Sequence, residues 1–252
     1  ACRAIAEGVD WECEVARNYA PRNMGCGLRP ASGISWVFEQ VEEAIILEDD
    51  CVPEDGFFTF CETLLRRYRD DTRVCMVSGF HHFGRTACGA DYFFAKTAAI
   101  WGWATWRRVW RQYDFNLRAA DDAAAMRQLE REVRHPRAAR RMVKNLRETR
   151  RRILAGETPS YWDTQWDWVK YSQNMVGIVP AGNLIRNVGI GDGSTHSAAS
   201  LRLLPGPIAR FFFSRTFAPG LPPEGPAHMF CRQDYDARYY RTAYPPLPVR
   251  GL

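Results

Sequence analysis

Four apolar residues, 44–47, run directly into the three acids Glu48, Asp49 and Asp50. A short apolar run without polar alternation is typical of a strand that is buried on both faces, as in a largely parallel sheet. The acids then stand at the carboxyl end of that strand, where open α/β sheets bind their ligands. Because adjacent carboxylates repel one another, a bound Mg²⁺ or Mn²⁺ ion would stabilise them. The stretch therefore favours a metal and diphosphate site, although an acidic turn in solvent would have the same pattern.

The composition is that of a globular protein. The 252 residues are 46% hydrophobic and 25% charged, which is enough to form one large core. The net charge of +5 fits an anionic substrate or an acidic surface without identifying either. The eight cysteines form no CxxC pair and no zinc-like spacing, so we expect reduced cysteines in the core. No apolar run approaches the ~20 residues of a membrane span and no signal peptide is visible, so the default expectation is a cytoplasmic enzyme.

Apolar segments of strand type and helix type alternate along the chain, which predicts an α/β layered sheet. Residues 100–106 are expected to be an aromatic loop, and the GxGxxG, GxxxxGK[ST] and GxSxG motifs are absent. The expected elements are strands at 44–47, 74–79, 92–95 and 176–180, and helices at 34–41, from Pro53 to Tyr68, within 119–152 and from Trp162 onward.

The domain organisation is expected to be one catalytic domain over residues 1–202 and a proline-rich, extended segment over residues 203–252 that packs on it. The chain opens without an initiator methionine and supplies no early strand, so we also expect an amino-terminal truncation.

Residues 119–152 are strongly basic and helical in pattern, and Pro136 should divide them into two helices. Such a run usually forms a solvated helix face. Contact with an anionic membrane or with nucleic acid is the alternative, and the absence of interleaved aromatic residues weighs against single-stranded nucleic acid. We therefore expect no nucleic-acid partner and leave peripheral membrane contact through residues 127–152 open.

An ordered set of motifs resembles the GT-A glycosyltransferases. The sequence Ile-Leu-Glu-Asp-Asp-Cys-Val-Pro at residues 46–53 is similar to their metal-binding region. The closest resemblance is to bacterial nucleotide-diphospho-sugar transferase-like proteins, often labelled hemolytic-protein-like. N-acetylglucosaminyltransferase I, whose acidic motif is also Glu-Asp-Asp, is more distantly similar. The other matching stretches are Phe57-Phe58, Leu64-Leu65, Ser78-Gly79-Phe80, Trp101 to Arg107, Trp162-Asp163 with Trp166, Pro180 to Gly189 and Thr195-His196, so the resemblance covers residues 13 to 200.

The resemblance implies a fold and a reaction. The fold is a GT-A-type, Rossmann-like, mixed and mostly parallel sheet flanked by helices, here expected to lack its first strand. The reaction is transfer of a hexosyl or N-acetylhexosaminyl group from a nucleoside-diphosphate sugar to a hydroxyl of a glycan, lipid-linked or protein acceptor. The implied cofactor is Mn²⁺ or Mg²⁺. Because the missing strand normally supplies part of the nucleotide pocket, a non-catalytic carbohydrate-binding or scaffolding domain of the same fold is the alternative.

The resemblance also assigns the metal site. It makes Asp50, the last acid of the motif, the direct metal ligand. Glu48 and Asp49 would hold the ribose, the sugar or metal-bound water. His196, in a glycine-rich loop, could complete the metal shell or contact the diphosphate, but a surface-loop histidine is an equal alternative.

Asp163 is the expected catalytic base, because the resemblance places a catalytic acid in the Trp162-Asp163 motif. A carboxylate can take the proton of the acceptor hydroxyl as that hydroxyl attacks the anomeric carbon, and a single displacement of this kind inverts the carbon. Asp167 is a second candidate, since it lies four residues on and shares a helix face with Asp163. The structural alternative for Asp163 is a helix N-cap.

The remaining candidates concern substrate binding. Trp101 and Trp103 could stack on sugar faces or pack in the core. Gly102 would let the backbone approach the donor closely. Arg22 and Asn23 stand where the resemblance suggests nucleotide contacts.

Two adjacent histidines, His81 and His82, follow the expected strand at 74–79. They could line the acceptor side of the site, or they could be solvated loop residues.

Overall fold

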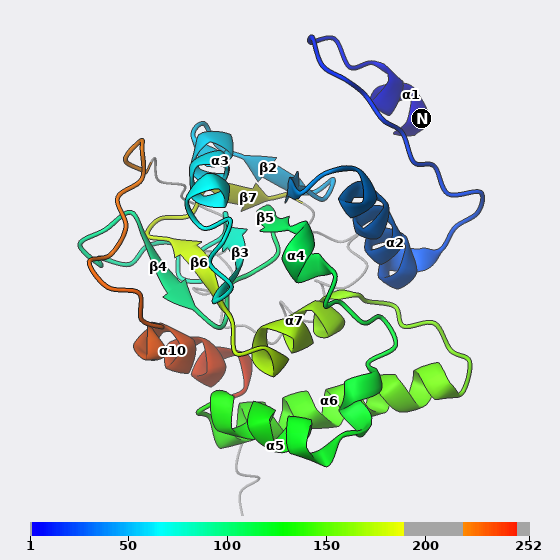
Figure 1. Cartoon of the computed structure of the whole chain (residues 1–252), viewed down its shortest axis with the longest axis vertical. Helices are drawn as coiled ribbons and strands as arrows, with labels where there is room; N and C mark the ends of the chain where they lie inside the picture. The colour runs from blue at the N-terminus through cyan, green and yellow to red at the C-terminus, as the bar shows by residue number, and fades with distance from the viewer. Residues whose placement is uncertain (1, 189–218, 246–252) are drawn as a thin grey trace, which may run out of the picture.

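The computed structural model describes residues 2–188 and 219–245, and its body is organised around a five-stranded sheet in the order β1-β5-β3-β6-β4 (Figure 1). A second, two-stranded sheet pairs β2 with β7. The strands are β1 (Glu43–Ile46), β2 (Cys51–Pro53), β3 (Val74–Ser78), β4 (Tyr92–Ala95), β5 (Trp103–Trp106), β6 (Val176–Pro180) and β7 (Ile185–Asn187). The helices are α1 (Cys2–Glu7), α2 (Gly25–Gln40), α3 (Phe57–Arg67), α4 (Arg107–Trp110), α5 (Ala123–Glu132), α6 (Pro136–Leu154), α7 (Asp163–Ser172) and α10 (Gln233–Ala243), with a 3₁₀ turn η1 (Arg118–Asp121).

The α/β class is confirmed, but the expectation of a mostly parallel sheet is wrong. Among the described strands of this sheet, only β3 and β6 pair in parallel, whereas the β1–β5, β3–β5 and β4–β6 pairs are antiparallel. β1 is an edge strand with four half-buried residues, so it is neither central nor buried on both faces. The apolar pattern of a strand indicates that its side chains are buried, but it does not indicate which strands lie beside it.

The sheet nevertheless gathers three strand ends at one edge. β1 and β3 both run antiparallel to β5, and β6 runs parallel to β3, so β1, β3 and β6 point the same way. Ile46 at the end of β1 and Ser78 at the end of β3 both pair with Trp103, the first residue of β5. The acids after β1 are therefore set beside the turn that begins β5.

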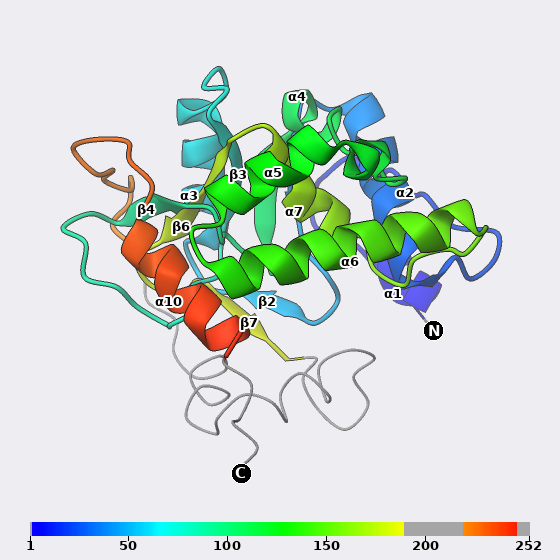
Figure 2. The same ribbon diagram turned by 90° about the horizontal axis from the view of Figure 1, so that it is seen from below.

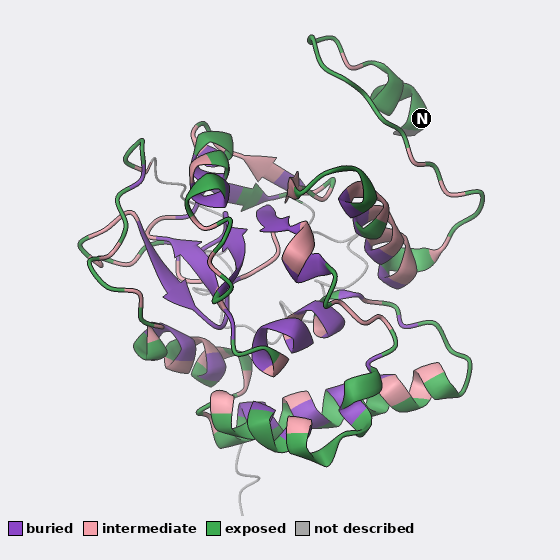
Figure 3. Ribbon diagram, viewed as in Figure 1, coloured by how far each residue is buried: buried purple, intermediate pink, exposed green. Residues whose placement is uncertain are grey.

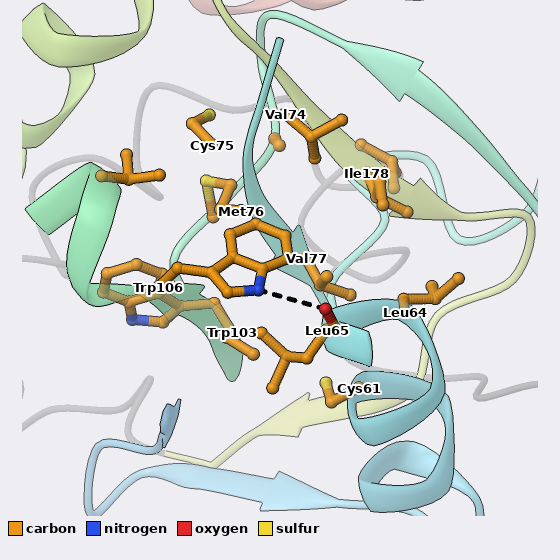
Figure 4. Close-up of a cluster of buried hydrophobic side chains, with 14 of the residues drawn as sticks. Cys61, Leu64, Leu65, Val74, Cys75, Met76, Val77, Trp103, Trp106 and Ile178 are labelled. Carbon is orange, nitrogen blue, oxygen red and sulfur yellow. Dashed lines mark hydrogen bonds between the residues drawn. The ribbon is translucent and has the colours of Figure 1, made fainter. Parts of the chain in front are cut away.

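The core lies between the sheet and the helices that cover it, as the purple segments of Figure 3 show. β3, β4 and β5 are buried at every residue, and their β-branched, sulfur-containing and aromatic side chains suit a covered pleated surface. α3 packs on this sheet through Leu64 and its neighbours. In Figure 4 the indole Nε1 of Trp106 donates a hydrogen bond of 3.1 Å to the backbone carbonyl of Leu65, which ties β5 to α3.

A second cluster of apolar side chains lies under α5, α6 and α7, and Figure 2 shows α5 and α6 side by side. The division of the basic region at Pro136 is confirmed, since α5 ends at Glu132 and Pro136 is the first residue of α6. His135 caps α6, because its Nδ1 accepts a hydrogen bond from the amide of Ala138. No helix among the described residues is both long enough and apolar enough to cross a bilayer.

Three elements differ from the sequence expectation. The expected aromatic loop at 100–106 contains strand β5, which Gly102, with a φ of 61°, introduces. Pro53 belongs to β2, so α3 begins only at Phe57, after Gly56 with a φ of 87°. The segment after residue 203 is not simply extended, since its described part contains α10, which packs against β4.

Candidate functional site

The acidic motif forms a tight turn between two strands. The amide of Cys51 donates to the carbonyl of Glu48 at 3.0 Å, which closes a four-residue turn with Asp49 and Asp50 at its centre. Beyond the turn, Cys51 pairs with Asn187 of β7, and the amide of Val188 donates to the carbonyl of Asp50. The backbone of the turn is thus held by β7 on one side. Glu48 and Asp50 are half-buried, whereas Asp49 is exposed.

The Cys51 thiol adds a further contact with the motif. Its Sγ lies 3.5 Å from Oδ1 of Asp50, and the side chain is buried. Burial, and then the negative charge of Asp50, raise the pKa of the thiol to about 12. Cys51 is therefore a neutral donor to Asp50 at physiological pH.

The carboxyl group of Glu48 is close enough to other acids to be affected by their negative charge. Its pKa is raised, first by burial and then by the charges of Asp50, Asp163 and Asp49. A hydrogen bond from the side chain of Trp162 acts in the opposite direction. The fold therefore brings Asp163 to the acidic motif, although more than a hundred residues separate them in the chain.

Asp163 is presented by the start of α7. It is the first residue of that helix, and Trp162 occupies the N-cap position, so the N-cap alternative for Asp163 is wrong. Its Oδ1 accepts a hydrogen bond of 2.9 Å from the amide of Thr164, and the side chain remains exposed. The positive end of the helix dipole favours an acid at this position.

Aromatic packing holds the turn that carries Asp163. The ring of Trp162 stacks on Trp103, with 5.8 Å between the ring centroids and 23° between the planes. The hydroxyl of Tyr113 donates to the carbonyl of Trp162 at 3.1 Å, and the ring of Tyr113 stacks on Trp110 at 4.4 Å. The sequence motif pointed to Trp162, but no local pattern pointed to Tyr113, because its contact is made across 49 residues.

Asp167, the other candidate base, has a different environment. Its carboxylate forms an ion pair of 2.6 Å with Nζ of Lys170. Lys170 is itself buried and also donates to the carbonyl of Ala98. Asp167 therefore neutralises a buried cation, whereas Asp163 is the acid that acts on Glu48.

The expected sugar-stacking tryptophans differ in exposure. Trp103 has no exposed surface and packs against Trp162 and Trp166, so the core-packing interpretation holds for it and sugar stacking does not. Trp101 is half-buried against Phe80, at 4.8 Å between the ring centroids. Sugar stacking on Trp101 therefore stays a prediction.

Gly102 has a packing role that the sequence expectation missed. A Cβ at this position would lie 2.6 Å from Cγ1 of Ile185 and 3.3 Å from Cδ2 of Leu47. Its carbonyl accepts a hydrogen bond of 2.7 Å from the amide of Gly79. Because Gly102 has no side chain, Ile185 of β7 can pack directly against its backbone. Ile185 therefore lies where the sequence expectation placed the donor.

The two expected nucleotide contacts lie before α2. Arg22 is exposed and forms no hydrogen bond or ion pair with any described residue. Asn23 accepts a hydrogen bond of 2.8 Å from the amide of Gly25, the first residue of α2. Neither residue is tied to the acidic turn, and His196 lies outside the described residues.

The interpretation of His81 and His82 as solvated loop residues is wrong. His81 is 1% exposed, and its Nδ1 accepts from the amide of Phe83, so Nε2 carries the proton. Burial is the main cause that lowers the pKa of His81 to about 3 and that of His82 to about 4. Both rings pack under α10, against Tyr235 and Tyr239, rather than facing the acidic turn.

The donor atoms at the turn suit a hard divalent cation. Among the described residues, no three or more His, Cys, Asp or Glu side chains form a group that could hold a metal ion by themselves. Mg²⁺ and Mn²⁺ need only one or two carboxylates where substrate phosphates supply further oxygen ligands. The mutual repulsion of Glu48, Asp50 and Asp163 also fits a site that gains a positive charge on binding. The carboxylate oxygens of Asp50 and Glu48 are therefore chemically compatible with such a cation.

No protein-family model matches the chain, and no curated protein matches it. What distinguishes the chain is its own geometry, in which the carboxylates of Glu48, Asp50 and Asp163 interact at the sheet edge.

Proposed function

We propose that the chain is a metal-dependent glycosyltransferase of GT-A type, which moves a sugar from a nucleoside diphosphate to an acceptor hydroxyl with inversion. The observation that supports this most is the convergence of Asp163 with Glu48 and Asp50 at one edge of the sheet. A reaction of this kind needs one carboxylate near the leaving diphosphate and a second carboxylate near the attacking hydroxyl. These positions match the two groups of acids that the motifs at 46–53 and 162–166 supply.

The proposed reaction is a single displacement. The oxygen of the acceptor hydroxyl forms a bond to the anomeric carbon, and the bond from that carbon to the diphosphate oxygen breaks. The proton of the hydroxyl passes to the carboxylate of Asp163. When bound, a divalent cation would stabilise the charge on the departing diphosphate.

The residues around the acids have supporting roles. Asp50 would bind the cation, and Glu48 would bind it or accept hydrogen bonds from the sugar. Trp162 and Tyr113 fix the position of Asp163, and the half-buried ring of Trp101 would contact the donor sugar or the acceptor. An exposed base and a half-buried metal ligand suit an acceptor that arrives from solvent.

The first test is thermal unfolding with Mn²⁺ and a panel of nucleoside diphosphates. A ligand at about 100 times its Kd stabilises the native state by about 2.7 kcal/mol. For a chain of this size that corresponds to a rise in Tm of ~5 °C or more. Asp50→Asn should abolish this rise.

Asp55→Asn is the matched control, because Asp55 is an exposed acid that follows the motif and stands outside the turn. It should leave the nucleotide-dependent rise in Tm intact. If Asp50→Asn responds to Mn²⁺ and nucleotide as the parent does, the metal assignment is wrong.

A further inference from the structure

Positive charge is concentrated on one helix. α6 contains eight Lys and Arg residues and a single acid, Glu148, so it carries +7 while the whole chain carries +5. The rest of the molecule is therefore slightly acidic. A net charge that comes from one helix creates a local field on one side of the molecule rather than a uniform weak field.

The charges of α6 lie on the face opposite its buried stripe. Ala138, Val143 and Leu146 pack into the apolar cluster beneath the helix. The exposed cations recur three or four residues apart, which places them on one outer face. Figure 3 shows this face as exposed segments along α6. The exposed cations of α6 are Arg137, Arg140, Arg141, Lys144, Arg147 and Arg151.

Most of these cations have no counter-ion within the described part of the chain. Arg151 pairs with Glu148, and the half-buried Arg150 and Arg152 pair with Asp121 and Glu157. An ordinary solvated helix surface mixes both signs of charge in similar numbers, whereas α6 has one acid, Glu148, among eight cations. The exposed α6 cations that form no ion pair with a described residue are Arg137, Arg140, Arg141, Lys144 and Arg147.

The length of this face suits an extended anionic partner. α6 has 19 residues and is therefore about 28 Å long, and α5 lies beside it (Figure 2). A shallow groove of about 460 Å³ runs along it, lined by Arg140, Lys144 and Arg147 together with the acids Glu130 and Glu148. At its carboxyl end, Leu154 is 67% exposed. No aromatic residue lies within α6 to stack on nucleic-acid bases.

We propose that the outer face of α6, defined by Arg137, Arg140, Arg141, Lys144 and Arg147, binds the surface of an anionic lipid bilayer. The guanidinium and ammonium groups would bind lipid phosphates, since Arg in particular matches phosphate geometry. Leu154 would enter the headgroup region at one end of the helix. The apolar face of α6 stays in the protein core, so the association is electrostatic and reversible.

This docking has a consequence for the acidic turn, although it does not depend on the proposed reaction. Asp163 follows Leu154 by nine residues, which limits the distance between them to about 32 Å. A bilayer bound along α6 would therefore lie no farther than this from Asp163 at the Leu154 end of the helix.

Sedimentation with vesicles tests the docking surface. The full chain is mixed with vesicles of phosphatidylcholine alone or with about 30% phosphatidylglycerol, at about 50 and 500 mM salt. We expect binding to the anionic vesicles at low salt, at least tenfold less binding at high salt, and little binding to phosphatidylcholine. The quadruple variant Arg140→Gln, Arg141→Gln, Lys144→Gln and Arg147→Gln should bind at least tenfold more weakly than the parent.

Two further variants separate the position of the charges from their number. A control that removes four exposed arginines elsewhere should bind anionic vesicles like the parent, although its net charge falls by the same amount. A charge-preserving variant with lysine at the three arginine positions should also retain binding. The control substitutions are Arg3→Gln, Arg17→Gln, Arg66→Gln and Arg111→Gln, and the charge-preserving ones are Arg140→Lys, Arg141→Lys and Arg147→Lys.

Three results would overturn the proposal. The parent could fail to bind anionic vesicles at low salt, or the two glutamine variants could lose binding equally. The parent could also bind duplex DNA more tightly than vesicles at the same salt, which would make nucleic acid the partner. The charge-preserving variant and the salt dependence of the parent keep the test decisive even if the α6 glutamine variant is unstable.

Discussion

At the scale of single residues, the candidate site depends on how a few neighbours hold the carboxylates. β7 fixes the backbone of the acidic turn, and Trp162 donates a hydrogen bond to Glu48 while it stacks on the buried ring of Trp103. The same Trp162 precedes Asp163 in the chain. One tryptophan therefore connects the two groups of acids, which makes their relative position a property of the core rather than of a flexible loop.

Removal of the proposed base should stop the transfer step but leave donor binding intact. Asp163→Asn keeps the size and the helix position of the side chain and loses its capacity to accept a proton. We expect a fall of about 10²- to 10⁴-fold in kcat for sugar transfer, which is the usual contribution of a general base. The melting response to Mn²⁺ and nucleoside diphosphate should persist.

A transferase assay with the sugar nucleotide that gives the largest melting response measures this loss. Asp163→Glu, which retains a carboxylate, should recover part of the activity. A rate for Asp163→Asn within threefold of the parent would remove Asp163 from the mechanism.

A side chain at Gly102 should destabilise the protein for two reasons, the positive φ of the backbone and a clash with Ile185. An alanine with a φ near 61° costs about 1–2 kcal/mol, and the clash with Ile185 adds about 1–3 kcal/mol more. Gly89 isolates the first cost, since its φ is 66° and no atom lies within 4 Å of its virtual Cβ.

Urea unfolding of Gly102→Ala and Gly89→Ala separates these costs. We expect the free energy of unfolding to fall by ~3 kcal/mol in the first variant and by ~1 kcal/mol in the second. Equal losses in both would mean that Ile185 moves aside without cost.

At the scale of elements, α10 is attached to the sheet by a buried carboxylate. Asp236 accepts hydrogen bonds from the amide of Lys96, and from both the amide and the hydroxyl of Thr97, at 2.7 to 3.1 Å. The thiol of Cys231 donates to the same carboxylate at 3.1 Å. These donors lie where β4 ends, so Asp236 satisfies backbone groups that would otherwise be buried without a partner.

Loss of that carboxylate should release α10. Asp236→Ala leaves the buried amides of Lys96 and Thr97 without an acceptor, and each such group costs about 1–3 kcal/mol. We expect a loss of ~3 kcal/mol or more in unfolding free energy and faster cleavage by trypsin after Arg238. Asp234→Ala, at an exposed acid of the same helix, should change stability by less than ~1 kcal/mol. Similar protease resistance in the two variants would contradict this role of Asp236.

At the scale of the whole molecule, stability should fall in acid because the buried His81 and the half-buried His82 are held in their neutral form. Their pKa values, about 3 for His81 and about 4 for His82, lie below the unfolded value of 6.5. Between pH 6.5 and those values the unfolded chain binds more protons than the native chain, so unfolding becomes easier as the pH falls. Their contribution is complete above pH 6.5. Each histidine can contribute a slope approaching ~1.4 kcal/mol per pH unit.

Urea unfolding at pH 7.5, 6.5 and 5.5 measures this slope. His81→Asn removes one titrating group and should reduce the slope. His228→Asn, at an exposed histidine, is the matched control and should keep the parent slope. A parent whose stability does not change over this pH range would contradict the buried, neutral state of both rings.

Local sequence was enough to predict the strands β1, β3, β4 and β6, the division of the basic region at Pro136, and the position of the acids just after a strand. These features follow from local periodicity and from residues, such as proline, that act on their own backbone. The folded molecule was needed to show that β5 lies between β1 and β3, that Trp103 is in the core, and that His81 and His82 lie beneath α10. Strand neighbours and burial depend on pairing between segments that are distant in the chain. A local pattern of apolar residues does not identify the segment that packs against them.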